Sequence, residues 1–351
     1  MDRILRVLVV DDSAYVRKVI KQMLSRSPFI DVVGTARDAE EALSLVEELH
    51  PDVVTLDLIM PGIGGLGFIR EQMSRAPVPI VVVSIASETS QSVLDALDSG
   101  AIDFVQKPSA LATEKVFEMS DDLIAKVKAA ADVRLAAVNP PRVGTQSSSR
   151  LRTKFKRPGI VVIGISTGGP QAMKYLVPRL PSDFPMPIAV VMHMPVGYTE
   201  IYAKRLNELS LLKVCEAQDG DELSAGCVLF APAGRHLTLI RTDSRVVTHL
   251  DARPFDTLHR PSVDVLFRSA ADTFGSDVLA LVMTGMGDDG KTGSSWIRSK
   301  GGIVFAEAEE SCVVFGMPRA VIEAGLANRT IPLEQMADAI SEVAYGESPD
   351  R

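Results

Sequence analysis

The residues best suited to catalysis in this sequence centre on a serine that follows an apolar run. Ser166 comes directly after residues 160–165, of which 160–163 have the composition of a buried parallel strand. Gly168, Gly169 and Pro170 come next and favour a tight turn into a helix. The free amides and the partial positive charge of a helix N-terminus suit a developing oxyanion. Ser166 could therefore be a nucleophile, provided that a neighbouring group accepts its proton.

A histidine and two aspartates could complete this chemistry. His193 ends a second apolar run, and Asp288 and Asp289 lie in a glycine-rich loop after the run 278–283. The carboxyl ends of parallel strands share one edge of a sheet, so these side chains can converge on the serine. We predict that His193 is the general base and that Asp289 or Asp288 orients its imidazole. Backbone amides of the loop 285–287 could bind the oxyanion.

The remaining histidines allow a second arrangement. Residues 164–168 match the G-x-S-x-G elbow of α/β-hydrolases, in which the acid precedes the histidine along the chain. That order would use Asp219 or Asp221 with a later histidine. The candidates are His236, His249 and His259. None of the three closes an evident strand, so we favour the first arrangement, although His236 and His259 could line the site or have a structural role.

A second group of reactive side chains lies in the first half of the chain. Asp11, Asp12, Asp57, Ser84 and Lys107 each stand at the end of an apolar run. Three carboxylates crowded at one sheet edge repel each other unless a cation holds them, and oxygen ligands suit Mg²⁺ or Mn²⁺. The lysine and the serine hydroxyl could then hold the oxygens of a phosphoryl group.

Strands and helices must alternate to bring these residues together, and the sequence predicts that they do. Segments with a helical period at 14–24, 39–49 and 90–98 separate apolar runs in the first half. The second half repeats the alternation, with helices predicted over 171–180 and 199–206. We therefore predict an α/β fold with a flavodoxin-like, doubly wound parallel sheet at the N-terminus and a second doubly wound α/β domain at the C-terminus.

The composition indicates where one domain ends and the next begins, and it disfavours a nucleic-acid-binding or membrane-spanning protein. A chain of 351 residues fits two domains, which we predict at 1–125 and 159–346. The end of a helix predicted over 111–137 and a linker rich in proline, glycine and serine fill 126–158. A net charge of −8 disfavours nucleic-acid binding, and no apolar stretch approaches the roughly 20 residues that span a bilayer. We expect a cytoplasmic protein without membrane insertion.

The first half resembles the receiver domain of two-component response regulators over about residues 4–125. The resemblance implies that a histidine kinase phosphorylates Asp57, and that Asp11, Asp12 and Asp57 bind Mg²⁺. The residues that match the family's phosphoryl-switch group are Ser84, Lys107 and the aromatic residue Phe104.

The second half resembles the chemotaxis protein-glutamate methylesterases, the CheB family. The resemblance rests on residues 165–169, 193–195, 231–236, 260–264, 284–290 and 314–319. It implies a Ser166, His193 and Asp289 triad, with the amide of Met286 serving the oxyanion and no cofactor in this domain. It further implies hydrolysis of glutamate γ-methyl esters on chemoreceptors, sometimes with glutamine deamidation, under control of the receiver. The alternative is a non-enzymatic response regulator whose second domain binds a partner.

Overall fold

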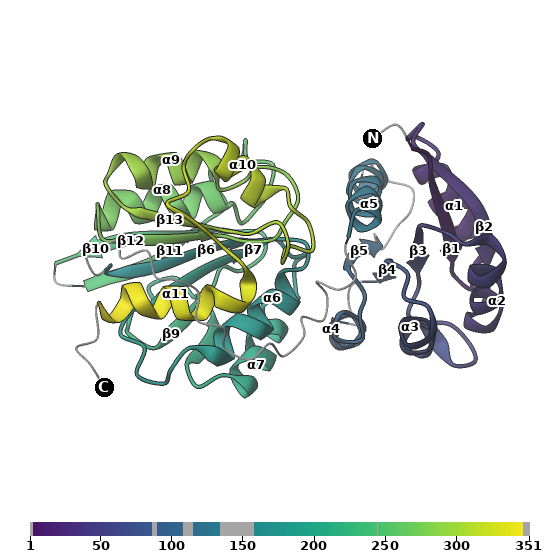
Figure 1. The fold of residues 1–351 in the computed structure, drawn as a ribbon, viewed down its shortest axis with the longest axis horizontal. Coiled ribbons are helices and arrows are strands. Elements are labelled where there is room, and N and C mark those ends of the chain that lie inside the picture. The colour runs from purple at the N-terminus through teal and green to yellow at the C-terminus, as the bar shows by residue number, and fades with distance from the viewer. Residues whose placement is uncertain (1–2, 86–89, 108–114, 134–157, 244, 347–351) are drawn as a thin grey trace. The chain divides into compact units, whose positions relative to one another are not determined.

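The computed structural model describes residues 3–85, 90–107, 115–133, 158–243 and 245–346, and the chain forms two compact units, 1–139 and 140–351. Figure 1 shows each unit as a sheet covered by helices. The predicted linker falls mostly on residues 134–157, which lie outside the described residues. No helix among the described residues is long and apolar enough to cross a membrane.

The first unit is built on five parallel strands in the order β2-β1-β3-β4-β5. The strands are β1 (Leu5–Val10), β2 (Ile30–Ala36), β3 (Val53–Leu56), β4 (Ile80–Ile85) and β5 (Asp103–Lys107). This is the predicted flavodoxin-like order, in which the chain reverses its direction of winding between β1 and β3. The register pairs Val10 with Leu56, so the residues that follow these two strands emerge side by side.

Helices cover the two faces of this sheet (Figure 1). They are α1 (Ala14–Leu24), α2 (Ala39–Leu49), α3 (Gly64–Arg75), α4 (Ser90–Asp98) and α5 (Lys115–Ala131). Helix α1 packs with α5, while α2 packs with α3 and α3 with α4, which gives one helical layer on each face. The ranges predicted for α1, α2 and α4 are confirmed, and local caps explain why: Ser13 and Asp38 accept amide hydrogen bonds at the starts of α1 and α2.

The second unit contains seven parallel strands in the order β14-β13-β12-β6-β7-β9-β8 and a separate antiparallel pair, β10-β11. The parallel strands are β6 (Ile160–Ile165), β7 (Ile188–Met192), β8 (Lys213–Glu216), β9 (Cys227–Phe230), β12 (Val278–Val282), β13 (Ile303–Glu307) and β14 (Arg329–Ile331). The hairpin strands are β10 (His236–Thr242) and β11 (Arg245–Asp251). Every residue of β6, β7 and β12 is buried, as expected for central strands covered on both faces.

Helices cover both faces of this sheet as well (Figure 1). They are α6 (Gly169–Leu176), α7 (Thr199–Leu209), α8 (Val263–Phe274), α9 (Lys291–Ser299), α10 (Met317–Glu323) and α11 (Leu333–Tyr345). Helix α8 packs with α9 and α9 with α10, while α6 packs with α7 and α11. The predicted helix 171–180 begins two residues earlier and ends at Leu176, where a 3₁₀ turn follows because Pro178 has no amide hydrogen to continue the helix.

The winding of this second sheet also reverses at a central pair of strands. The chain starts at β6, adds β7 on one side, and later places β12 on the other side of β6. Ligands of open α/β sheets bind beyond the carboxyl ends of the strands at such a reversal. Ser166 follows β6 and the loop 284–290 follows β12, so the fold places both predicted segments at this point.

Candidate functional sites

Ser166 begins the turn that connects β6 to α6. Its amide donates to the carbonyl of Thr284 (3.0 Å), and its own carbonyl accepts from the amide of Gly169 (2.7 Å). Gly168 has a φ of +81°, and a Cβ atom there would lie 2.5 Å from Val313, so this tight turn requires glycine. The turn leaves Ser166 half-buried beside the N-terminus of α6.

His193 follows β7, the strand next to β6. Its amide donates to the carbonyl of Ile165 (3.1 Å), so the histidine backbone lies beside the residue that precedes Ser166. Its Nε2 atom lies 2.9 Å from Oδ2 of Asp289. Its Nδ1 atom is buried and has no hydrogen-bond partner within the described residues. When the Asp289 carboxylate accepts the Nε2 proton, Nδ1 carries the lone pair that a general base needs.

Asp289 is held by four hydrogen-bond donors. Besides His193, its Oδ2 accepts from the amide of Val263 (2.8 Å), and its Oδ1 accepts from the hydroxyl of Ser262 and the amide of Asp264 (both 2.9 Å). These amides belong to the first turn of α8, where a negative charge is favourable. Burial alone would raise the pKa of Asp289, but His193 and these amides outweigh it and lower the pKa to about 2. The carboxylate therefore stays ionised and holds the imidazole.

The two aspartates of the loop differ in their surroundings, and the family resemblance had implied Asp289. Asp288 is exposed, whereas Asp289 is largely buried and bonded to His193. Asp264, in the first turn of α8, in turn accepts from the amides of Gly290 (2.9 Å) and Gly293 (2.6 Å) at the start of α9. Hydrogen bonds to α8 and from the start of α9 therefore fix the loop that carries Asp289, and of the two aspartates only Asp289 contacts His193.

The predicted oxyanion loop lies against the serine. A Cβ atom on Gly285 would be 2.8 Å from Cβ of Ser166, so the loop approaches the serine more closely than any other residue type would allow. The carbonyl of Gly285 accepts from the amides of Gly316 (3.1 Å) and Met317 (2.9 Å), which anchors the loop to the start of α10. Met286 follows directly and is half-buried. Its amide is therefore carried on a fixed backbone next to Ser166.

The alternative arrangement with a later histidine finds no support in the geometry. Asp219 pairs with His249 (3.0 Å) in an exposed ion pair that lies outside the network around Ser166. His259 has a different relation to the site, because its ring stacks on the ring of His193 with centroids 4.1 Å apart and an interplanar angle of 25°. From the sequence, His259 could line the site or have a structural role, and the stacking places it beside His193.

His236 is a fully buried residue behind the site. Its Nδ1 accepts from the amide of Ser262 (3.2 Å), and its Nε2 lies 3.1 Å from the carbonyl of Pro254. Burial, helped by the charge of Arg260, lowers its pKa, so the neutral ring with a proton on Nε2 satisfies both contacts. His236 therefore helps to position Ser262, whose hydroxyl donates to the Asp289 carboxylate.

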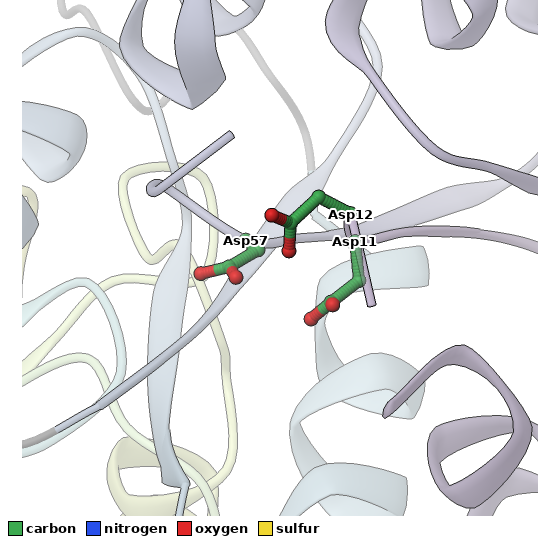
Figure 2. A group of neighbouring side chains, drawn as sticks. All are labelled: Asp11, Asp12 and Asp57. Atoms are coloured by element: carbon green, nitrogen blue, oxygen red, sulfur yellow. The ribbon is translucent and has the colours of Figure 1, made fainter. Parts of the chain in front are cut away.

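The second cluster, in the first unit, joins the ends of β1 and β3. Figure 2 shows the carboxylates of Asp11, Asp12 and Asp57 gathered there, with one oxygen of each within 4.8 Å of the others. Asp11 and Asp57 are buried and Asp12 is exposed. Three carboxylate oxygens at this spacing, open to solvent on one side, match the ligands that Mg²⁺ prefers. The predicted metal residues are therefore brought together.

A single lysine holds the two buried carboxylates of this cluster. Nζ of Lys107 lies 2.6 Å from Oδ2 of Asp11 and 2.8 Å from Oδ2 of Asp57. Burial nevertheless raises the pKa of Asp57 above its usual value, because the attraction of Lys107 does not fully offset desolvation and the charge of Asp11 adds to it. The cluster thus carries more negative charge than it can neutralise by itself.

The remaining predicted switch residues lie on the two adjacent strands. Ser84 on β4 and Phe104 on β5 are both buried, with 1% and 3% of their surface exposed. Ser84 pairs with Gln106, two residues beyond Phe104, so the register puts Ser84 and Phe104 on one face of the sheet. Lys126 of α5 holds the carbonyl of Phe104 (2.7 Å).

Comparison with known proteins agrees with the division into two units. A family model described as CheB methylesterase matches residues 161–340, and one described as response regulator receiver domain matches residues 7–119. A Myxococcus xanthus protein named protein-glutamate methylesterase/protein-glutamine glutaminase 5 is 51% identical over 95% of this chain and 96% of its own length. A Symbiobacterium thermophilum protein of the same name, without the number, is 45% identical over 99% of both chains.

A solved structure matches the second unit. The crystal structure of the Thermotoga maritima CheB methylesterase catalytic domain is 43% identical, with a TM-score of 0.52, and the match covers 53% of this chain and 98% of that domain.

Proposed function

The chain belongs to the CheB methylesterase family and carries a response regulator receiver domain, and we propose that it hydrolyses its ester substrate through Ser166, His193 and Asp289. The function that follows from the family is that of a protein-glutamate methylesterase in chemotaxis, acting on glutamate γ-methyl esters. The same relatives are named glutaminases, so deamidation of receptor glutamines belongs to the proposal. The methylated substrate would be a chemoreceptor in the cytoplasm.

The observation that carries the triad assignment is the hydrogen-bonding state of His193. One ring nitrogen is held by Asp289 at 2.9 Å, and the other is buried without a partner. We infer that Nδ1 takes the proton of Ser166 as its oxygen attacks the ester carbonyl, while Asp289 stabilises the imidazolium. The amide of Met286 would donate to the oxyanion. Methanol would then leave with the proton from His193, and water would release the glutamate by the same steps in reverse.

The receiver cluster supports a second proposal, that Asp57 is the phospho-acceptor. Asp11, Asp12 and Asp57 would hold Mg²⁺, which would offset the negative charge of an incoming phosphoryl group. Lys107 already contacts Asp57 at 2.8 Å and could bind a phosphoryl oxygen. Ser84 on β4 and Phe104 on β5 would change conformation when Asp57 is phosphorylated. A histidine kinase would be the phosphodonor.

We further propose that the unphosphorylated receiver restricts access to the esterase and that phosphorylation of Asp57 relieves this restriction. A modest free-energy difference suffices, because about 1.4 kcal/mol changes an equilibrium tenfold. A purely binding role for the second domain has less support, since a binding module has no need for a serine, a general base and an orienting carboxylate.

The direct test is Ser166→Ala in the full chain. We expect methanol release from methylated receptor to fall by about 10⁴-fold or more, because the nucleophile is lost. Phosphorylation of Asp57 by a small phosphodonor should be unchanged, which shows that the receiver is intact, and an unchanged unfolding transition of the second unit shows that the unit carrying the substitution is folded. If the variant releases methanol at the wild-type rate, Ser166 is not the nucleophile.

A further inference from the structure

Glu307 is a buried carboxyl group that the mechanism above does not use. It is the last residue of β13, the neighbour of β12, and it is 0% exposed. Among the described residues, no lysine, arginine or histidine forms an ion pair with it, although a buried carboxylate without a cation is costly. Its contacts therefore require an explanation.

One oxygen of the Glu307 carboxyl accepts a hydrogen bond from Thr284, which in turn is hydrogen-bonded to Ser166. Oε2 of Glu307 accepts from the amide of Thr284 (2.8 Å), and the carbonyl of Thr284 accepts from the amide of Ser166 (3.0 Å). The hydroxyl of Thr284 donates to the carbonyl of Thr167 (3.0 Å). Thr284 thus connects β12 to the nucleophile turn, and Glu307 satisfies the amide that would otherwise be left unpaired behind it.

The other oxygen of Glu307 belongs to a hydrogen-bond network that can form whether Glu307 is ionised or protonated. Oε1 of Glu307 lies 3.0 Å from the hydroxyl of Ser311, which also accepts from the amide of Leu333 (2.9 Å) and lies 3.2 Å from the carbonyl of Ala308. The Ser311 hydroxyl can donate to an ionised Glu307. When Glu307 is protonated, the carboxyl can donate to Ser311, whose hydrogen then turns to Ala308. Thr284 keeps its acceptor in both states.

We propose that Glu307 is a positioning residue for Ser166, acting on it through the backbone of Thr284. This inference rests on the proposed role of Ser166 and deepens it.

Burial raises the pKa of Glu307 to about 7, so its charge changes near neutral pH. The ionisable groups that act on it are Glu334 of α11, whose charge raises the pKa further, and the Cys312 thiol, whose own pKa is raised by burial. Neither supplies positive charge. An ionised Glu307 therefore adds negative charge behind the loop that would bind the oxyanion, and this charge opposes oxyanion formation.

Two substitutions of Glu307 in the full chain distinguish a role in positioning Ser166 from a role in core packing alone. Glu307→Gln keeps an acceptor for Thr284 and mimics the protonated network, so we expect kcat for methanol release within about threefold of wild type below pH 7. Glu307→Met keeps the volume but removes the acceptor, so we expect kcat to fall about tenfold or more with KM unchanged. Rescue by glutamine and a loss confined to kcat are not expected of a residue that only stabilises the fold.

The pH profile provides a second readout that does not depend on the methionine variant folding. The ratio of Glu307→Gln to wild-type kcat should rise about threefold or more as the pH increases from about 6 to 9. Glu310→Gln makes the same charge change at an exposed position nearby and should show a constant ratio. A constant ratio for Glu307→Gln, or a folded Glu307→Met variant with wild-type kcat, would overturn the inference. Ser166→Ala assayed in parallel distinguishes the two failures. Turnover that does not depend on Ser166 would contradict the proposed function and this inference with it, whereas turnover that depends on Ser166 but not on Glu307 would contradict the inference alone.

Discussion

The two strand-end sites of this chain hold their key carboxylates in opposite ways. In the receiver, Asp57 shares one lysine with Asp11, and burial raises its pKa. In the esterase unit, Asp289 has four hydrogen-bond donors and a pKa of about 2. The same fold principle places both at the carboxyl edge of a parallel sheet. The first site keeps an excess of negative charge that a cation could neutralise, and the second keeps one carboxylate ionised by surrounding it with hydrogen-bond donors.

Of the substitutions at the two sites, we expect the largest effect from replacing Asp289, and we expect it on turnover. Asp289→Asn should lower kcat for methanol release by about 10³- to 10⁴-fold, because an amide does not hold the His193 tautomer as a carboxylate does. Asp288→Asn is the matched control, since Asp288 is exposed, and we expect its kcat to stay within about threefold of wild type. Comparable losses in the two variants would contradict the assignment of Asp289.

The same substitution should also change the pH dependence of stability. The pKa of Asp289 is lowered to about 2 in the folded state, so its ionisation contributes about 2 kcal/mol above pH 4. This contribution is lost as the pH falls from about 4 to about 2. Urea unfolding of the esterase unit at several pH values should show that loss in the wild type but not in Asp289→Asn. Parallel curves for the two proteins would show that the donors around Asp289 do not favour its charge.

Removing the Asp57 carboxylate should stabilise the receiver, whereas removing the Asp289 carboxylate should destabilise the esterase unit at neutral pH. Because burial raises the pKa of Asp57, the stability that the group contributes falls as the pH rises from its unfolded pKa through its folded pKa. At neutral pH without Mg²⁺, Asp57→Asn should therefore raise the receiver's unfolding midpoint by a few degrees, about the shift that 1 kcal/mol produces in a small domain. Calorimetry of the full chain, which follows both transitions, measures this. A lower midpoint would mean that Lys107 stabilises the Asp57 charge by more than burial costs.

A further expected effect concerns the metal. Adding Mg²⁺ at about 100 times its dissociation constant should stabilise the receiver by about 2.7 kcal/mol and leave the esterase transition in place. Asp12→Ala removes one proposed ligand that is exposed and outside the Lys107 pairs, so it should weaken this response without unfolding the domain. An equal Mg²⁺ response in the variant would place the ion elsewhere.

Much of the fold could be predicted because its signals are local. Helices α1 and α2 begin at side-chain caps, Ser13 and Asp38, that the sequence displays. The apolar runs place Ser166 and His193 at the ends of adjacent strands, and strand alternation is enough to bring them to one edge.

The rest depends on contacts between distant segments. Apart from the family resemblance, which implied Asp289, the residue pattern does not distinguish Asp288 from Asp289, because the amides that hold Asp289 lie in α8, 25 and 26 residues away. The stacking of His259 on His193 and the hydrogen bond from Thr284 to Glu307 also depend on tertiary packing. Glu307 ends an apolar strand, and its sequence neighbours give no sign that it lies behind Ser166.

The most direct test of the account is methanol release from methylated receptor by the full chain, with and without a small phosphodonor. We expect a low basal rate that rises about tenfold or more with the phosphodonor. The rise should be absent in Asp57→Asn, and the rate should be lost in Ser166→Ala under both conditions. Methanol release that persists without Ser166, or that rises equally without Asp57, would contradict the division of chemistry and control between the two sites.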